Sequence, residues 1–150
     1  MIKILNANKI VDILNFFKTN NEIYFPKTLN SLFTEGHMQL RNLIFNQYII
    51  PIAEMAGSEI KRMALFDFRY YGENTMYVLL LCGNIDKNFL EKCYKKILEN
   101  NYEIKKISVR FLSSDLNSNI VDLLELKNFK KELEVKLGDN IFYQFSSFYE

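Results

Sequence analysis

Apolar positions recur along the chain with two different periods, which predict where the helices and strands lie. A short apolar segment at 2–5 predicts a strand, and a helical stripe follows it, formed by Ile10, Ile13, Leu14 and Phe17. A second helix is predicted to begin at Pro26, because proline is favoured in the first turn of a helix. Residues 34–46 carry a further helical pattern.

After residue 47 the pattern favours strands. Three strands are predicted at 48–55, 62–71 and 75–82, with turns between them at 56–58 and 72–74. Proline cannot donate a hydrogen bond to a strand ladder, so Pro51 predicts a sheet edge or a bulge. The unbroken apolar run 76–81 predicts a central strand that is buried on both faces.

The last third of the chain alternates helices with strands. Asp86 is a predicted helix cap, and the stripe after it contains Phe89, Leu90, Cys93, Ile97 and Leu98. A strand follows in which Ile107, Val109 and Phe111 face one way. Residues 119–145 predict a helix, a short break and two alternating strands joined by a turn at 138–140.

The predicted order is therefore β-α-α-β-β-β-α-β-α-β-β, in a single domain spanning residues 1–150. Three consecutive strands that lead into a crossover helix predict an α/β (α+β) fold with a central mixed sheet. Its first strands should form antiparallel hairpins, and a parallel pair should follow between residues 76 and 111. We expect helices to flank this sheet.

Composition narrows the class of protein. The chain is 49% hydrophobic and 15% aromatic, which excludes a disordered segment. Its 19 basic and 18 acidic residues nearly cancel, which argues against nucleic-acid binding. The longest apolar run is far shorter than the ~20 residues that span a membrane, and the first residues carry no signal-peptide pattern.

Two cysteines, Cys82 and Cys93, form no C-x-x-C pair. We expect both to be reduced core residues, which favours a cytoplasmic location. The richness in Asn, Lys and Ile is typical of an AT-rich, bacterial genome.

Common catalytic and phosphate-binding motifs are absent. The chain has neither a Walker-type nor a dinucleotide glycine loop, and neither H-E-x-x-H nor G-x-S-x-G. Its one histidine, His37, has no cysteine or carboxylate at ligand spacing. A lone histidine of this kind is more often structural, so we expect no metal site and no histidine-based triad.

Residues 117–131 carry a more specific pattern, because Asn117 is followed by "SNIVDLLELKNFKK". This segment resembles the end of the GNAT superfamily of acyl-CoA-dependent N-acetyltransferases, where an asparagine precedes a helix reading A-x-x-L-Y-E-K-x-G-F. The matching positions are Ile120, Leu123, Glu125 and Phe129. The residue-level similarity is confined to about the last third of the chain, whereas the order of elements matches over nearly all of it.

The resemblance implies a site for acetyl-CoA or another acyl-CoA. In GNAT proteins two neighbouring parallel strands diverge, and their exposed peptide groups pair with the pantetheine arm of the coenzyme. Residues 78–82 and 107–111 would line this wedge, and the helix that begins near Asp86 would offer its amides to the pyrophosphate. The implied cofactor-binding residues are Leu80, Leu81, Cys82, Gly83, Asn84, Lys87 and Asn117.

Three departures from the family pattern stand out. The phosphate-binding signature Q/R-x-x-G-x-G/A is replaced by "CGNIDKN", in which Gly83 is the one glycine. Leu124 occupies the position of the family's frequent acid, a tyrosine. Asn128 replaces a glycine, a mild change because asparagine tolerates the left-handed conformation.

Two functions follow from the resemblance. The first is an N-acyltransferase that acts on a small-molecule or peptide amine, with Glu54, Asp67 and Tyr70 as catalytic candidates and Tyr143 as another possible acid. The alternative is a catalytically inactive GNAT-like fold that serves as a binding or assembly module, and an unrelated α/β domain is the third possibility. The apolar C-terminal strands predict a homodimer.

Overall fold

The computed structural model describes residues 1–20, 23–24, 37–69, 74–100 and 102–149. Short 3-10 turns at Ala7–Lys9 and Ser113–Asp115 accompany the longer elements. In chain order these are β1 (Ile2–Ile4), α1 (Ile10–Thr19), β2 (Ile23–Tyr24), α3 (His37–Phe45), β3 (Ile49–Ala56), β4 (Glu59–Asp67), β5 (Thr75–Cys82), α4 (Lys87–Leu98), β6 (Lys106–Leu112), α5 (Ser118–Leu126), β7 (Lys130–Leu137) and β8 (Asn140–Phe148). Apart from β2, this order is the predicted one. The helix predicted at Pro26 lies outside the described residues.

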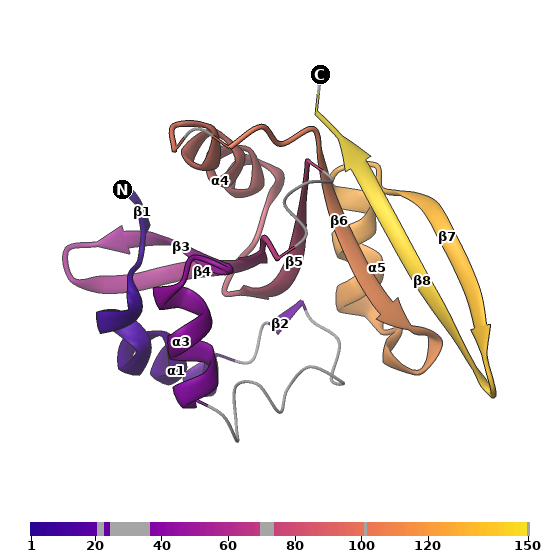
Figure 1. The fold of residues 1–150 in the computed structure, drawn as a ribbon, viewed down its shortest axis with the longest axis horizontal. Helices are drawn as coiled ribbons and strands as arrows, with labels where there is room; N and C mark the ends of the chain where they lie inside the picture. The colour runs from indigo at the N-terminus through magenta and orange to yellow at the C-terminus, as the bar shows by residue number, and fades with distance from the viewer. Residues whose placement is uncertain (21–22, 25–36, 70–73, 101, 150) are drawn as a thin grey trace.

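The strands form one mixed sheet in the order β1-β3-β4-β5-β6-β8-β7, with β2 pairing to β5 outside this linear order. Every described pair is antiparallel except β5 with β6, which is parallel. Figure 1 shows β3 and β4 on one side of this parallel pair and β8 and β7 on the other. The predicted hairpins and the predicted parallel pair are therefore confirmed.

Two apolar clusters cover the two faces of the sheet. One joins α4 and α5 to the sheet through buried residues such as Phe89 and Leu123, and the other joins α1 and α3 through Ile13 and Leu40. All eight residues of β5 are buried, as its continuous apolar sequence predicts. Burial on both faces makes β5 the centre of the fold.

Pro51 departs from its predicted position. β3 lies between β1 and β4 and is not an edge strand, and its irregularity falls between Glu54 and Met55. The proline is tolerated because the short β1 pairs only with Ile52–Glu54, so Pro51 lies just beyond that ladder. Its carbonyl oxygen accepts a hydrogen bond from the Leu5 amide at 2.9 Å.

The ends of the last two helices follow the sequence closely. Asp86 accepts a hydrogen bond from the Phe89 amide at the start of α4, and Asn117 accepts one from the Ile120 amide at the start of α5. After α5, Asn128 has a φ of 56°, the left-handed conformation predicted for it. These three polar residues mark the start of α4 and both ends of α5.

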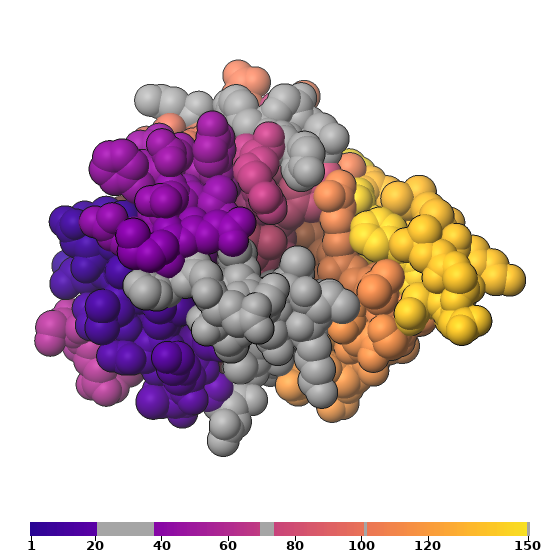
Figure 2. Space-filling view, turned by 60° about the horizontal axis from the view of Figure 1, so that its bottom comes forward, coloured from indigo at the N-terminus to yellow at the C-terminus, as the bar shows by residue number. Residues whose placement is uncertain are grey.

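The C-terminal hairpin forms one end of the molecule. Every residue of β7 is exposed, and Figure 2 shows β7 and β8 at the opposite end of the molecule from the N-terminal elements. Leu133, Val135 and Leu137 expose 44%, 40% and 53% of their surface, so an apolar stripe follows this edge strand.

The described part of the chain contains no helix that is long and apolar enough to cross a membrane. Cys82 and Cys93 are both buried and form no disulfide, which agrees with the predicted role of core residues.

Candidate functional site

The parallel strands β5 and β6 diverge after only three residue pairs. Their register runs from Thr75 opposite Lys106 to Tyr77 opposite Ser108 and ends there. The predicted wedge therefore exists, but on β6 it begins at Val109, because Ile107 and Ser108 are still paired with β5. From this point β5 turns toward β4, and β6 continues beside β8 (Figure 1).

A β-bulge in β5 explains the divergence. Leu65 of β4 pairs with Leu80 and the next residue, Phe66, pairs with Val78, so Leu79 is an extra residue on β5. Leu79 and Leu80 both pack in the α1–α3 cluster, which breaks the alternation of faces. A bulge bends its strand and increases the local twist, and here it turns β5 away from β6.

The open edge of β5 is partly covered. Leu81 pairs with Tyr24 and Cys82 pairs with Ile23 of the short antiparallel strand β2. The expectation that the whole edge of β5 lacks a strand partner is therefore wrong for these two residues. A strand edge as apolar as this one readily pairs with an extended segment that lies within reach.

A cation–π contact closes the narrow end of the wedge. The Arg110 guanidinium lies 3.9 Å from the centroid of the Tyr77 ring, across the point at which the two strands part. Arg110 also donates a hydrogen bond from Nε to Oε1 of Gln144 at 2.8 Å, which ties it to β8. The contact links β5 to the C-terminal strands where their backbone pairing stops.

A polar network that includes the buried Ser108 and Ser146 fixes β6 against the C-terminal hairpin. The hydroxyls of Ser108 and Ser146 lie 2.6 Å apart, and Glu132 accepts hydrogen bonds from Lys106, Gln144 and Ser146. Burial alone would raise the pKa of Glu132, but these hydrogen bonds outweigh it and lower the pKa. These hydrogen bonds hold β6, which forms one side of the wedge, firmly against β7 and β8.

The loop that follows β5 packs tightly on β4. Gly83 has a φ of +97°, and a Cβ added there would lie 2.9 Å from Cβ of Arg62 and 3.0 Å from the carbonyl oxygen of Lys61. No other residue type fits this close approach without a shift of β4. The close approach of the loop to β4 is therefore enough to explain why a glycine stands at this position. A phosphate-binding role is not needed to explain it.

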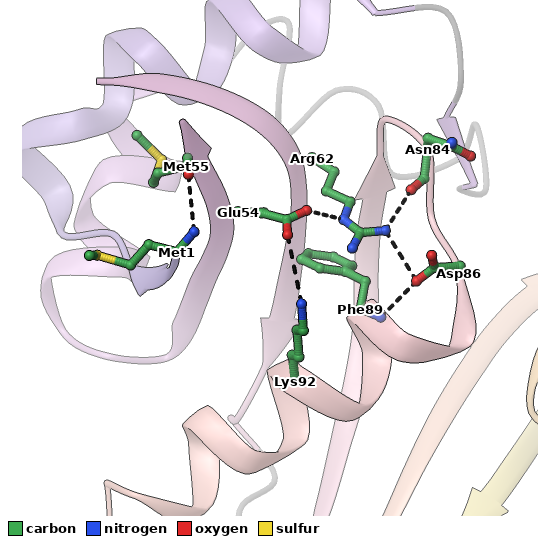
Figure 3. Close-up of polar contacts among 8 residues, drawn as sticks. All are labelled: Met1, Glu54, Met55, Arg62, Asn84, Asp86, Phe89 and Lys92. Atoms are coloured by element: carbon green, nitrogen blue, oxygen red, sulfur yellow. Dashed lines mark hydrogen bonds and ion pairs between the residues drawn. The ribbon is translucent and has the colours of Figure 1, made fainter. Parts of the chain in front are cut away.

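Arg62 organises the groups around this loop (Figure 3). Its side chain is 13% exposed, and it donates hydrogen bonds from Nε to Glu54 and from Nη1 to the Asn84 carbonyl oxygen. Nη1 also lies 3.1 Å from Oδ1 of Asp86. Burial disfavours the charge, but the hydrogen bonds that Arg62 donates to Glu54 and Asp86 outweigh it and raise the pKa of Arg62. The guanidinium stacks over the Phe89 ring at 4.7 Å.

The amino end of α4 already holds an anion. Oδ1 of Asp86 accepts the Phe89 amide at 2.8 Å, and this hydrogen bond, followed by the ion pair with Arg62, lowers the pKa of Asp86. The carboxylate thus takes the place that a bound pyrophosphate would need, near the positive end of the helix dipole. The amino end of α4 therefore does not fit a pyrophosphate.

The predicted catalytic residues lie apart from one another. The Glu54 carboxylate points toward α4 and is paired with Arg62 and Lys92. Asp67, at the end of β4, is buried, and both of its oxygens accept hydrogen bonds from Arg69. Tyr70 lies outside the described residues. Tyr143 packs against Phe111, with ring centroids 5.6 Å apart.

The predicted cofactor-binding residues form two groups. Leu80, Leu81 and Cys82 follow the bulge along the edge of the wedge, and their side chains are fully buried, so only their peptide groups can bind a ligand there. The second group surrounds the helix ends: Gly83 and Asn84 contact Arg62, Lys87 is exposed on the first turn of α4, and Asn117 caps α5.

Sequence reasoning missed Arg62, Arg110 and the bulge at Leu79. Arg62 comes directly before an apolar run in β4. A cation so close to buried residues usually has an acidic partner, and this was the available signal in the sequence. The bulge left no sequence signal, because all residues around it are apolar.

No protein-family model and no curated protein matches the sequence. Solved structures do match it. A probable acetyltransferase from Staphylococcus epidermidis is 12% identical, with a TM-score of 0.68 and 99% of this chain and 98% of the other covered. The aminoglycoside 6'-N-acetyltransferase from Enterococcus faecium is 9% identical, with a TM-score of 0.68 and coverage of 99% and 96%. An aminoglycoside acetyltransferase solved with coenzyme A is 12% identical, with a TM-score of 0.60 and coverage of 99% and 94%.

These similarities define an acetyltransferase-like fold that extends over nearly the full length of the chain. The chain thus shares the fold of solved N-acetyltransferases, which is the fold that the resemblance of the segment after Asn117 implies. At identities this low, the similarity establishes the fold and leaves the substrate open.

A substitution of Gly83 tests the tight packing of the loop. We expect Gly83→Ala to lower the free energy of unfolding by about 2–4 kcal/mol, because strain at positive φ adds to a clash with the β4 backbone. Gly57→Ala is the matched control, since Gly57 also has a positive φ but nothing within 4 Å, and should cost only about 1 kcal/mol. Urea denaturation measures both, and equal losses would contradict the packing argument.

The role of Asp86 is testable through pH. Asp86→Ala should lower the free energy of unfolding by about 1 kcal/mol at neutral pH, because a helix cap is lost. The pKa of Asp86 is lowered in the folded state, so its stabilisation is present above the unfolded pKa and disappears as pH falls through the folded pKa. The parent and Asp86→Ala should therefore converge in acid, as measured by urea denaturation.

Asp86→Asn keeps an acceptor oxygen at the cap and cannot titrate, which makes it the control. Its denaturation curves should show no acid dependence from this position. A difference between parent and Asp86→Ala that stays constant from neutral pH into acid would contradict the assignment.

Proposed function

We propose that the protein is an acyl-CoA-dependent N-acyltransferase that transfers an acetyl or other acyl group to an amine. The observation that carries this proposal is the divergence of β5 from β6 at the Leu79 bulge. Diverging parallel strands expose peptide groups to an amide-rich ligand, and the pantetheine arm of a thioester is such a ligand. The fold shared with N-acetyltransferases supports the same class of reaction.

The reaction needs few specialised side chains. The amine nitrogen attacks the thioester carbonyl, a C–N bond forms, the C–S bond breaks, and the thiolate leaves and takes up a proton. Holding the two reactants together supplies much of the rate, and a backbone N–H can stabilise the oxyanion. The bulge at Leu79 leaves peptide groups outside the regular β4–β5 ladder, so this position is our candidate for that donor.

The acid–base groups remain proposals. Glu54 and Asp67 are both held in ion pairs with arginines, so each would have to leave its partner before taking a proton from the attacking amine. Water at the wedge can perform this step without them. Tyr70 is the third proposed group.

A second candidate function has its own supporting observation. The Asp86 carboxylate and Arg62 fill the amino end of α4, where an acyl-CoA pyrophosphate would bind. This arrangement favours a GNAT-like fold that does not bind CoA and serves as a binding or assembly module. Binding measurements with fragments of the coenzyme separate the two candidates.

The acceptor and the assembly are part of the same proposal. We propose a small-molecule or peptide amine as acceptor, since the aminoglycoside acetyltransferases among the structural neighbours are named for an amine-bearing substrate. We propose a cytoplasmic location because both cysteines are buried without a disulfide. A second copy of the chain is the proposed partner for the exposed apolar stripe of β7.

Isothermal titration calorimetry with three ligands tests the proposed function. Acetyl-CoA should bind saturably, and pantetheine should bind within about threefold of CoA, because the wedge holds the arm and α4 adds little for the pyrophosphate. Adenosine 3',5'-bisphosphate, which lacks the arm, should give no heat. Absence of heat from all three at millimolar concentration would reject the enzyme and favour the binding module.

The proposed dimer is tested at the stripe on β7. The double variant Leu133→Lys, Val135→Lys should lower the mass measured by light scattering to that of a monomer, because each lysine places a charge in the apolar contact. Glu134→Ala is the control on the other face of the same strand and should leave the mass unchanged. A parent protein that is monomeric at high concentration would contradict this proposal.

A further inference from the structure

β2 is the one described strand that stands outside the linear order of the sheet. Its two residues pair antiparallel with Leu81 and Cys82 of β5, on the side that faces the wedge. It also contacts α5, the helix that follows β6 (Figure 1). β2 therefore lies inside the wedge, between β5 and the C-terminal part of the fold.

The edge of β5 can pair with one partner at a time. β4 holds the other edge of β5 over five residue pairs, so the wedge side is the only edge at which a further extended segment can add to Leu81 and Cys82. The side chains of both residues are fully buried, which leaves their peptide groups as the binding surface. A pantetheine arm that followed this edge over its full length would use these same groups.

We propose that β2 is an internal competitor of the pantetheine arm, and that the arm gains its full contact with β5 only when residues 23–24 leave the edge. This inference rests on the proposed acyl-CoA function. It goes beyond that function because it assigns a role to a segment that the reaction does not use. In the free protein the chain itself supplies the strand that the ligand would otherwise supply.

The relative size of the two ladders makes the displacement of β2 feasible. β2 contributes two residue pairs, whereas β4 and β5 share five and β6 and β8 share seven. The weakest ladder at the wedge is thus the one that blocks it. β2 also follows α1 closely, and Ile13 and Phe17 anchor α1 in the core, so a released β2 stays near the edge and can return.

Hydrogen exchange detects this pairing without any ligand. Neighbouring amides of a strand point to opposite edges, so one amide of Leu81 and Cys82 faces β2 and the other faces β4. In the variant Ile23→Pro, Tyr24→Pro, which cannot donate to the ladder, the amide facing β2 should exchange at least tenfold faster. The amide facing β4 should be unchanged, and it is the internal control for folding.

Calorimetry with coenzyme A then tests the competition. If β2 covers the edge in about nine molecules of ten, removing it should tighten CoA binding about tenfold, because the apparent Kd scales inversely with the competent fraction. Ile23→Val, Tyr24→Phe keeps both backbone donors and should bind CoA like the parent. Ile23→Gly, Tyr24→Gly weakens the strand without proline and should shift the Kd in the same direction.

The outcomes separate the two proposals. Faster exchange at one amide together with tighter CoA binding supports the competition. Unchanged exchange at both amides, or faster exchange with an equal Kd, overturns it while the acyl-CoA function stands. Absence of CoA binding to the parent and to every variant rejects the acyl-CoA function itself, and the competition with it.

Discussion

One extra residue in the central strand determines the shape of this molecule. β5 pairs with β4 on one side and with β6 on the other, but with the extra residue Leu79 it follows β4 from Tyr77 to Cys82 and β6 only from Thr75 to Tyr77. A bulge inserts a residue that the neighbouring strand cannot match, so the bulged strand turns. This turn explains why β5 diverges from β6 and why β2 can pair with the open edge of β5. It also sets the position of the loop that leads into α4.

The chain fills the space that the turn creates with its own groups. β2 covers part of the open edge of β5, and Asp86 takes up the amides at the start of α4, with Arg62 neutralising its charge. A ligand can shift such a state only by as much as its affinity for the open form exceeds that for the closed form. Under the proposed function, the arm of the thioester would compete with the two residue pairs of β2, whereas the pyrophosphate would compete with the capped and ion-paired carboxylate of Asp86.

The sequence predicted the order of elements and the parallel pair because their signals are local. The alternation of Ile107, Val109 and Phe111, the cap at Asp86 and the asparagine at 128 each act within a few residues. The bulge was not predicted, because residues 76–81 are all apolar. Their sequence therefore does not show which face of the sheet each side chain lies on. β2 is too short for any period to show.

The contacts around Arg62 were not predicted for another reason. Its partners come from β3, from the loop after β5 and from α4, and no spacing along the chain brings Glu54, Asp86 and Phe89 together. The catalytic candidates were chosen as carboxylates on strands near the wedge, and the structure shows that such residues also serve as ion-pair partners within the fold. Asn117 was expected at the cofactor, and its visible role is to cap α5.

The two walls of the wedge differ in how firmly they are held. β6 is bound to β8 over seven residue pairs and pinned by the hydrogen bonds among Ser108, Ser146 and Glu132. Among the described residues, β5 beyond its bulge pairs only with β4 and the short β2. β6 is therefore the more firmly held strand of the pair, and β5 beyond its bulge is the less firmly held one. The contact of Arg110 with Tyr77 joins the two strands where their backbone pairing stops. If ligands of different width enter the wedge, we expect β5 beyond its bulge to shift and β6 to stay in place.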